Sequence, residues 1–130
     1  MTTLEHFATL TGTLDFEMQG TVPAGTRIDI RFTGVVTSAH WEGERPAAGI
    51  DYVTIRSDGA GELHVHATVG EGDDLVSYEA RGLQTKAGVV ETMYFQTASE
   101  ELAFLNEAVG VATGGVDGNT LTLEISLVKP

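Results

Sequence analysis

Two acidic residues occupy positions at which the sequence pattern predicts apolar side chains. In the segment 49–56, alternation places Asp51 on the same strand face as Val53 and Ile55, because successive side chains of a β-strand point to opposite faces. In the segment 88–95, the same alternation places Glu91 on the face of three apolar residues, Val89, Met93 and Phe95. Both carboxyl groups are therefore predicted to point toward a protein interior.

A buried carboxyl group has a limited choice of states. Burial of an unpaired charge is costly, so the group either finds a partner or raises its pKa. A carboxyl group with a raised pKa can act as a general acid or base near neutral pH. The structural alternative is an ion pair with an interior Arg, or a bulge that shifts the register. For Asp51 and Glu91, the sequence leaves both interpretations open.

The segment His64-Val65-His66 offers a different chemistry. Two imidazoles at positions i and i+2 of a strand share a face and can bind one metal ion. With Glu71, the pair loosely resembles the first metal motif of cupins, but no histidine follows His66 to supply the second motif. The alternative interpretation is a solvated polar strand face opposite Leu63, Val65, Ala67 and Val69.

Several other chemistries find no support in the chain. No serine lies in a nucleophile-elbow glycine pattern. No glycine-containing loop carries the lysine of a phosphate site or the strand–loop–helix order of a dinucleotide site. The absence of cysteine excludes disulfides, thiolate metal sites and a cysteine nucleophile. The acid–base chemistry predicted for Asp51 and Glu91 needs no cofactor.

Charge and composition also limit the classes of molecule that the protein is expected to bind. The net charge is −12, from 19 acidic and 7 basic residues, and the basic residues are scattered singly. Nucleic-acid binding normally requires clustered Lys and Arg, so nucleic acids and anionic membranes are disfavoured. The segment 1–6 lacks the basic start of a signal peptide, and no apolar run approaches the roughly 20 residues of a membrane helix. These features predict a soluble cytoplasmic protein.

The segments that carry these residues are predicted to form β-strands almost throughout the chain. Strands are expected at roughly 4–16, 27–38, 50–56, 62–69, 75–83, 88–96, 108–112 and 120–127, with glycine-rich turns between them. One short helix is expected after Thr97, because Thr97 and Glu100 have the spacing of a capping box and a short apolar patch follows at Leu102, Phe104 and Leu105.

This pattern predicts one all-β domain over residues 1–130. Hydrophobic residues make up 42% of the chain, enough for a real core. Seven or eight short strands indicate an antiparallel sandwich or a closed, or nearly closed, barrel. A barrel of about eight strands has an interior just wide enough for side chains or one small ligand.

Three stretches of the chain resemble DUF3237, a family of small bacterial and fungal β-barrels of unknown function. They are 41–52, the Asp73-Asp74 turn, and 94–97 followed by 104–106 and 111–114. The resemblance implies a calycin-like closed barrel of about eight strands with one short helix, and a pocket near Asp51 and Asn106. It brings no established reaction.

The resemblance also bears on His66. Family members carry an Arg-Tyr pair where this chain has His66-Ala67, so His66 could take the place of a pocket arginine. Alternation points Val65 and Ala67 inward instead, and the sequence alone does not decide which face of the segment 62–69 lines the interior.

Three hypotheses about function follow. The first is a cofactor-independent isomerase, cyclase or lyase acting on a small, partly apolar metabolite. In it, Asp51 is the general base, Glu91 or His66 is the second acid–base group, and Asn106 or Tyr94 polarises a carbonyl. Trp41, Tyr52 and Tyr94 are candidates to line the ligand pocket.

The second hypothesis is a non-catalytic, lipocalin-like barrel that binds a hydrophobic small molecule. The third is a metal-dependent, cupin-like enzyme that uses His64 and His66. In each case the expected partner is a small molecule, and assembly into a homo-oligomer is compatible with the sequence.

Overall fold

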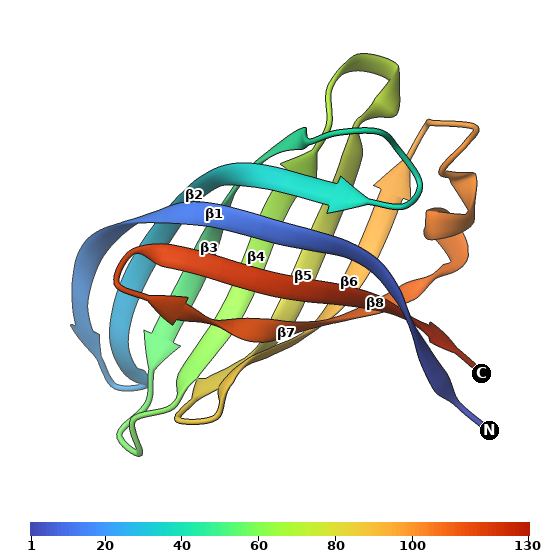
Figure 1. Ribbon diagram of the computed structural model, residues 1–130. Helices are drawn as coiled ribbons and strands as arrows, with labels where there is room; N and C mark the ends of the chain where they lie inside the picture. Colours follow the sequence, from blue (N-terminus) through green and yellow to red (C-terminus); the bar gives the residue numbers. More distant parts are fainter.

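The computed structural model describes residues 1–130 as eight antiparallel strands that close into one barrel (Figure 1). Strands adjacent in sequence pair in space, and β1 pairs with both β2 and β8. The closed eight-stranded barrel predicted from the sequence is confirmed. The strands are β1 (Thr3–Val22), β2 (Gly25–Ser38), β3 (Arg45–Ile55), β4 (Gly61–Val69), β5 (Val76–Thr85), β6 (Gly88–Thr97), β7 (Val109–Asp117) and β8 (Thr120–Lys129).

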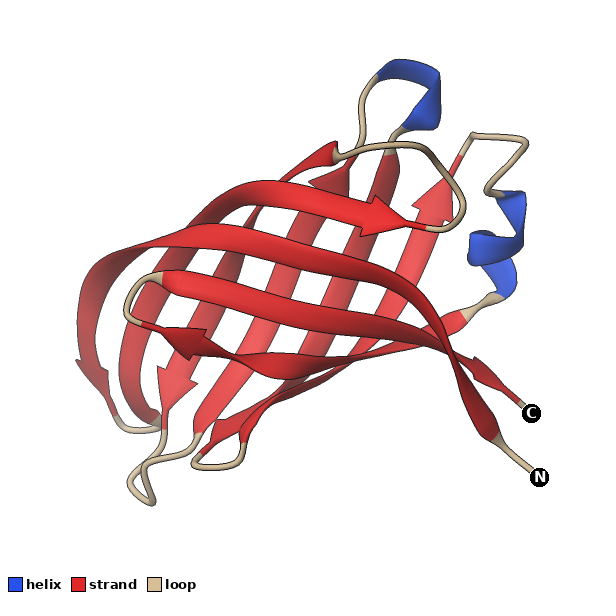
Figure 2. Ribbon diagram, viewed as in Figure 1, coloured by secondary structure: helices blue, strands red, loops and turns tan.

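The expected helix is only a 3-10 turn. The helical segments are η1 (Gly72–Asp74) and η2 (Ala103–Glu107), shown in Figure 2. The capping-box prediction is wrong because Thr97 is the last residue of β6. Its Oγ1 donates a hydrogen bond to the Leu75 carbonyl (2.8 Å) and accepts one from the Ser99 N–H (3.1 Å). Neither helical segment is long and apolar enough to cross a bilayer.

Alternation along the strands separates an apolar interior from a polar exterior. On β4, Leu63, Val65, Ala67 and Val69 are buried, whereas His64 and His66 lie on the outer face. The structure therefore decides which face of this strand lines the interior. The inward residues of the other strands complete one continuous core around them.

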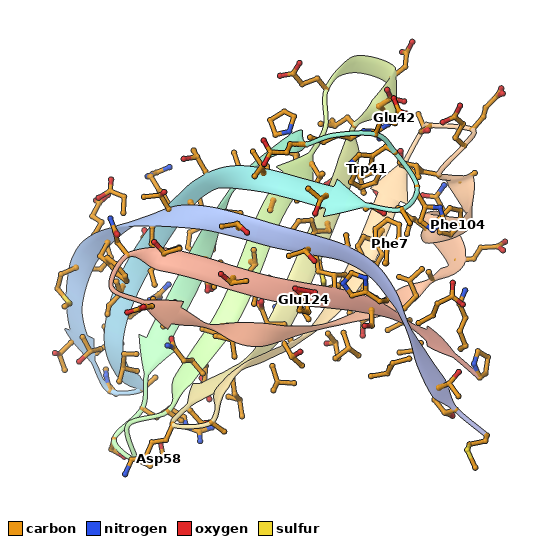
Figure 3. All side chains as sticks on the ribbon, viewed as in Figure 1. Phe7, Trp41, Glu42, Asp58, Phe104 and Glu124 are labelled. Carbon is orange, nitrogen blue, oxygen red and sulfur yellow. The ribbon has the colours of Figure 1, made fainter.

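An aromatic cluster fills the end of the barrel that carries η2 and the two chain termini. Phe7 makes edge contacts with Trp41 and Phe104, at ring distances of 5.9 and 6.2 Å, and all three are labelled in Figure 3. The Trp41 indole N–H donates to the Val36 carbonyl oxygen (3.2 Å). Buried Leu102 and Leu105 pack from the segment that contains η2. This end of the barrel is closed by side chains.

The opposite end carries the hairpins β1–β2, β3–β4, β5–β6 and β7–β8. There β1 is longer than its neighbour: pairing with β8 stops at Thr13, and β1 continues to Val22. Phe16 and Met18 share the inward face of β1 with Leu14, but they are 51% and 66% exposed. The β1–β2 ribbon therefore extends apolar side chains beyond the barrel wall.

Gly82 of β5 lies opposite Glu91 in the β5–β6 register. A methyl group at position 82 would overlap the Val90 carbonyl oxygen and lie 2.7 Å from the Glu91 Cα. Both are backbone atoms of a paired strand, so they cannot move without disturbing the ladder. We expect Gly82→Ala to lower the free energy of unfolding by about 1–3 kcal/mol, as measured by urea denaturation.

Gly115→Ala is the matched control, since a methyl group at Gly115 meets nothing within 4 Å. Its effect should stay within about 0.5 kcal/mol. Equal destabilisation by the two variants would show that the close approach at Gly82 has no energetic weight.

Candidate functional site

An apolar pocket lies inside the barrel on the side of the hairpins. Hydrophobic residues account for 10 of the 13 that line it, and its polar members are Asp51, Gln84 and Glu91. Its volume of about 40 Å³ holds about three water molecules, since one water needs about 10–15 Å³. Partly exposed Gln84, Val116 and Leu121 lie beside the β5–β6 and β7–β8 turns, and they mark this end as the mouth of the pocket.

The barrel wall holds the two carboxyl groups on β3 and β6, with β4 and β5 between them. In the strand register, Asp51 is level with Val65 and Ala80, and Glu91 is level with Gly82 and Leu63. Leu63 and Val65 of β4 and Tyr78 of β5 line the pocket between the two carboxyl groups.

Asp51 also completes the pairing of β3 with β4. The register pairs Asp51 with Val65 and then Thr54 with Glu62, so Tyr52 and Val53 have no partner on β4. The Asp51 Oδ1 accepts a hydrogen bond from the His64 backbone N–H (3.1 Å) within this gap. Burial raises the pKa of Asp51 to about 6, and the hydrogen bond opposes the rise.

Glu91 is the more deeply buried of the two. Its side chain is 5% exposed, and its Oε2 is buried without any hydrogen-bond partner. Burial raises the pKa of Glu91 to about 7, and the negative charge of Asp51 adds to the rise. No Arg, Lys or His forms an ion pair with either carboxyl group. The interior arginine considered from the sequence is therefore absent.

Tyr78, one of the ten hydrophobic lining residues, also brings a hydroxyl group to the pocket. It lies on the inward face of β5 and is 5% exposed. Burial raises its pKa, and the charges of Glu91 and Asp51 raise it further, so the hydroxyl stays protonated and can donate a hydrogen bond. The alternation of buried Val76, Tyr78 and Ala80 was the available signal for this position, but nothing in the sequence linked Tyr78 to the acids.

The other residues predicted for the site lie elsewhere. His66 is on the outer face of β4 with its side chain 55% exposed, so it does not join Asp51 and Glu91. Tyr52 and Tyr94 are exposed on the outer surface, and Trp41 packs at the closed end.

Asn106 is held by β6 rather than by the pocket. Its Oδ1 accepts from the Thr97 N–H (2.8 Å), and its Nδ2 donates to the Thr97 carbonyl oxygen (3.0 Å). Asn106 therefore links η2 to the end of β6. Among the predicted site residues, only Asp51 and Glu91 line the pocket.

The outer face of β4 and β5 brings together a possible set of metal ligands, namely His64, His66 and Glu79, whose ligand atoms lie within 4.8 Å of one another. Glu79 pairs with His66 across the strands. Glu71, the acid suggested by the cupin motif, lies in the loop before η1 instead.

Comparison with known proteins identifies the fold but no family. No family model matches the chain, and no curated protein matches it. A protein of unknown function from Clostridium acetobutylicum superposes with a TM-score of 0.87 at 18% identity, covering 99% of this chain and 100% of that one. A β-barrel-like protein from Acinetobacter baumannii gives a TM-score of 0.85 at 20% identity, with coverages of 99% and 97%.

A third similar structure is described as an enzyme from Penicillium herquei, with a TM-score of 0.77 at 15% identity and coverages of 98% and 95%. At these identities the similarity shows a shared fold alone. The resemblance to DUF3237 remains a prediction.

The buried carboxyl groups predict an unusual dependence of stability on pH. For Glu91, whose pKa rises from 4.5 to about 7, the native state retains a proton that the unfolded state has released between these values. The free energy of unfolding should therefore fall as the pH rises through this window. In Glu91→Gln, the fall between pH 4 and pH 8 should shrink by about 3 kcal/mol, as measured by urea denaturation at both pH values.

Glu17→Gln serves as the control, because Glu17 is exposed on β1. Its pH dependence should match that of the wild type. A Glu91→Gln variant with the wild-type pH dependence would mean that Glu91 is ionised at little cost in the native barrel.

Proposed function

We propose that the protein is a cofactor-independent acid–base enzyme, an isomerase, cyclase or lyase, acting on a small and partly apolar metabolite. The observation that carries the proposal is the placement of two carboxyl groups without ion-pair partners in one apolar pocket. Stability alone does not explain this placement, because neither carboxyl group neutralises a buried cation.

The environments of the two carboxyl groups suggest which one acts as the base and which one acts as the acid. Asp51 receives a hydrogen bond from the His64 N–H and has the lower pKa, about 6, so it is the better candidate for the base. Glu91 has no hydrogen-bond partner on Oε2 and a pKa of about 7, so it retains its proton to a higher pH. Between these values one group can accept a proton while the other donates one.

A carbonyl substrate fits this arrangement. The Asp51 carboxylate would remove a proton from the carbon next to the carbonyl. The electron pair of that C–H bond would form a new C=C bond, and the π pair of the carbonyl would move to its oxygen. Glu91 would donate its proton to this oxygen. The protonated Tyr78 hydroxyl would stabilise the developing negative charge by a hydrogen bond. Tyr78 thus takes the role first considered for Asn106 or Tyr94, which lie outside the pocket.

The size of the pocket limits what enters it. A volume of about 40 Å³ accepts only the reacting end of a metabolite. The remainder would lie at the mouth, where Phe16 pairs with the pocket residue Ile30 and Met18 follows on the same face of β1. Both side chains are exposed, and this supports a substrate with an apolar portion outside the barrel.

A non-catalytic binding barrel is the second candidate, and the mostly apolar lining of the pocket favours it. The Penicillium herquei protein supports the first candidate only to the extent that an enzyme has the same fold.

Exchange of carbon-bound hydrogen separates the two candidates. We expect the protein in D₂O to catalyse deuterium incorporation next to the carbonyl of some members of a panel of small cyclic ketones and β-ketoesters, followed by ¹H NMR. In Asp51→Asn, which keeps an oxygen able to accept from the His64 N–H, the exchange rate should fall by about 10²–10⁴-fold.

Asp15→Asn is the matched control, because Asp15 is exposed on β1, and it should exchange at the wild-type rate. Exchange by Asp51→Asn at the wild-type rate would refute the assignment of the base. Saturable binding of the same ketones without any exchange would favour the binding barrel.

A further inference from the structure

The outer face of the barrel carries a second group of side chains that the pocket does not use. His64 and His66 project from β4, and Glu79 projects from β5. The His64 and His66 Nε2 atoms are 3.2 Å apart, and they lie 3.3 and 3.2 Å from the Glu79 Oε1. The three atoms form a nearly equilateral triangle.

The edge lengths of this triangle are close to those of one face of a tetrahedral metal site. Zinc binds histidine nitrogen and carboxylate oxygen at about 2.0–2.2 Å, which separates adjacent ligands of a tetrahedron by about 3.3–3.6 Å. Cis ligands of an octahedral ion at about 2.0–2.1 Å would lie only about 2.9 Å apart. The observed spacing favours tetrahedral coordination.

Hydrogen bonding alone does not account for all three contacts. Each Nε2 carries at most one hydrogen, and an ionised carboxylate carries none. At most two edges of the triangle can therefore be hydrogen bonds, and the third is a close approach of polar atoms without a shared proton. A bound cation would use all three atoms as ligands at once.

The surroundings fix these ligands and leave them accessible. The β4–β5 ladder pairs His66 directly with Glu79, so two ligands are set by strand geometry. The Tyr52 ring lies against both imidazoles, at ring distances of 6.4 and 6.3 Å. The side chains of His66 and Glu79 are 55% and 57% exposed, and a groove of about 240 Å³ beside them leads to solvent.

We propose that His64, His66 and Glu79 bind a divalent transition-metal ion, with Zn²⁺ the best match, and leave a fourth coordination position open to solvent. The site lies on the side of the β4 wall opposite the interior pocket, and the proposal does not depend on the proton-transfer chemistry there. The net charge of −12 further favours a cation at the surface.

Calorimetric titration with ZnCl₂ tests the proposal, using tag-free protein treated with a chelator and then dialysed. We expect one Zn²⁺ per chain. His66→Ala and Glu79→Gln should each weaken binding by more than about tenfold, since even the loss of an outer-shell partner costs 10–100-fold in affinity. Zn²⁺ should also raise the melting temperature of the wild type and not that of His66→Ala.

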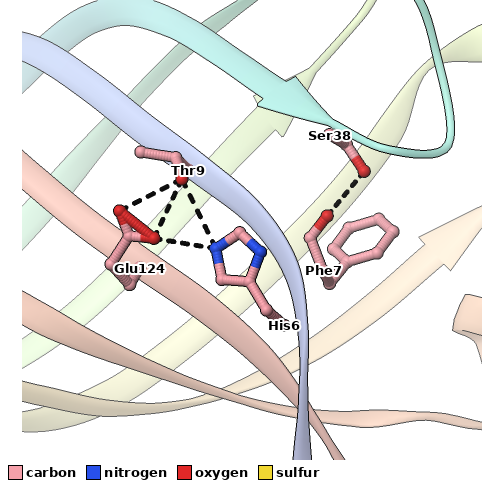
Figure 4. A network of polar contacts seen from close by, with 5 residues as sticks. All are labelled: His6, Phe7, Thr9, Ser38 and Glu124. Carbon is pink, nitrogen blue, oxygen red and sulfur yellow. Dashed lines mark hydrogen bonds and ion pairs between the residues drawn. The ribbon is translucent and has the colours of Figure 1, made fainter.

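His6→Ala is the matched control. His6 Nε2 lies 2.7 Å from Glu124 Oε2, with Thr9 alongside (Figure 4), so it is a second exposed His–Glu pair without another imidazole. This variant should bind Zn²⁺ as the wild type does. The proposal is overturned if the wild type shows no saturable binding, if His66→Ala binds as tightly, or if His6→Ala weakens binding equally.

Discussion

The loss of water around Asp51 and Glu91 is the constraint on which the rest of the site depends. Closing the barrel places both carboxyl groups in an apolar pocket, where their charged forms are disfavoured. Forcing both to ionise would cost a few kcal/mol, a large share of the roughly 5–15 kcal/mol that stabilises a typical domain. The same desolvation brings their pKa values to about 6 and about 7, where proton transfer is useful.

The two faces of β4 contribute to two different groups of side chains. Its inner face supplies apolar Leu63 and Val65 to the pocket, and its outer face presents His64 and His66 beside Glu79. The backbone of His64 connects the two sides, because its N–H donates to Asp51 while its ring belongs to the outer cluster. Because successive side chains of a strand point to opposite faces, one strand of a closed barrel can contribute to a site on each side of the wall.

Much of this arrangement could be predicted from local pattern. Period-two alternation alone predicts that Asp51 and Glu91 point inward, and turn signals indicate where most strands lie. The predictions that were wrong concern features that depend on contacts between strands or on local chain geometry. Glu79 meets His66 only through the β4–β5 register, and the sequence suggested Glu71 instead. The segment after Thr97 has helical spacing, but the hydrogen bonds of Thr97 and Asn106 keep it as a 3-10 turn.

The desolvation of Asp51 and Glu91 is tested most directly by a ¹³C NMR titration of the side-chain carboxyl groups, with Asp51→Asn and Glu91→Gln used to assign the signals. We expect titration midpoints of about 6 for Asp51 and about 7 for Glu91. Midpoints near 4 for both groups, the range of solvated carboxyls, would show that neither group is desolvated in the barrel.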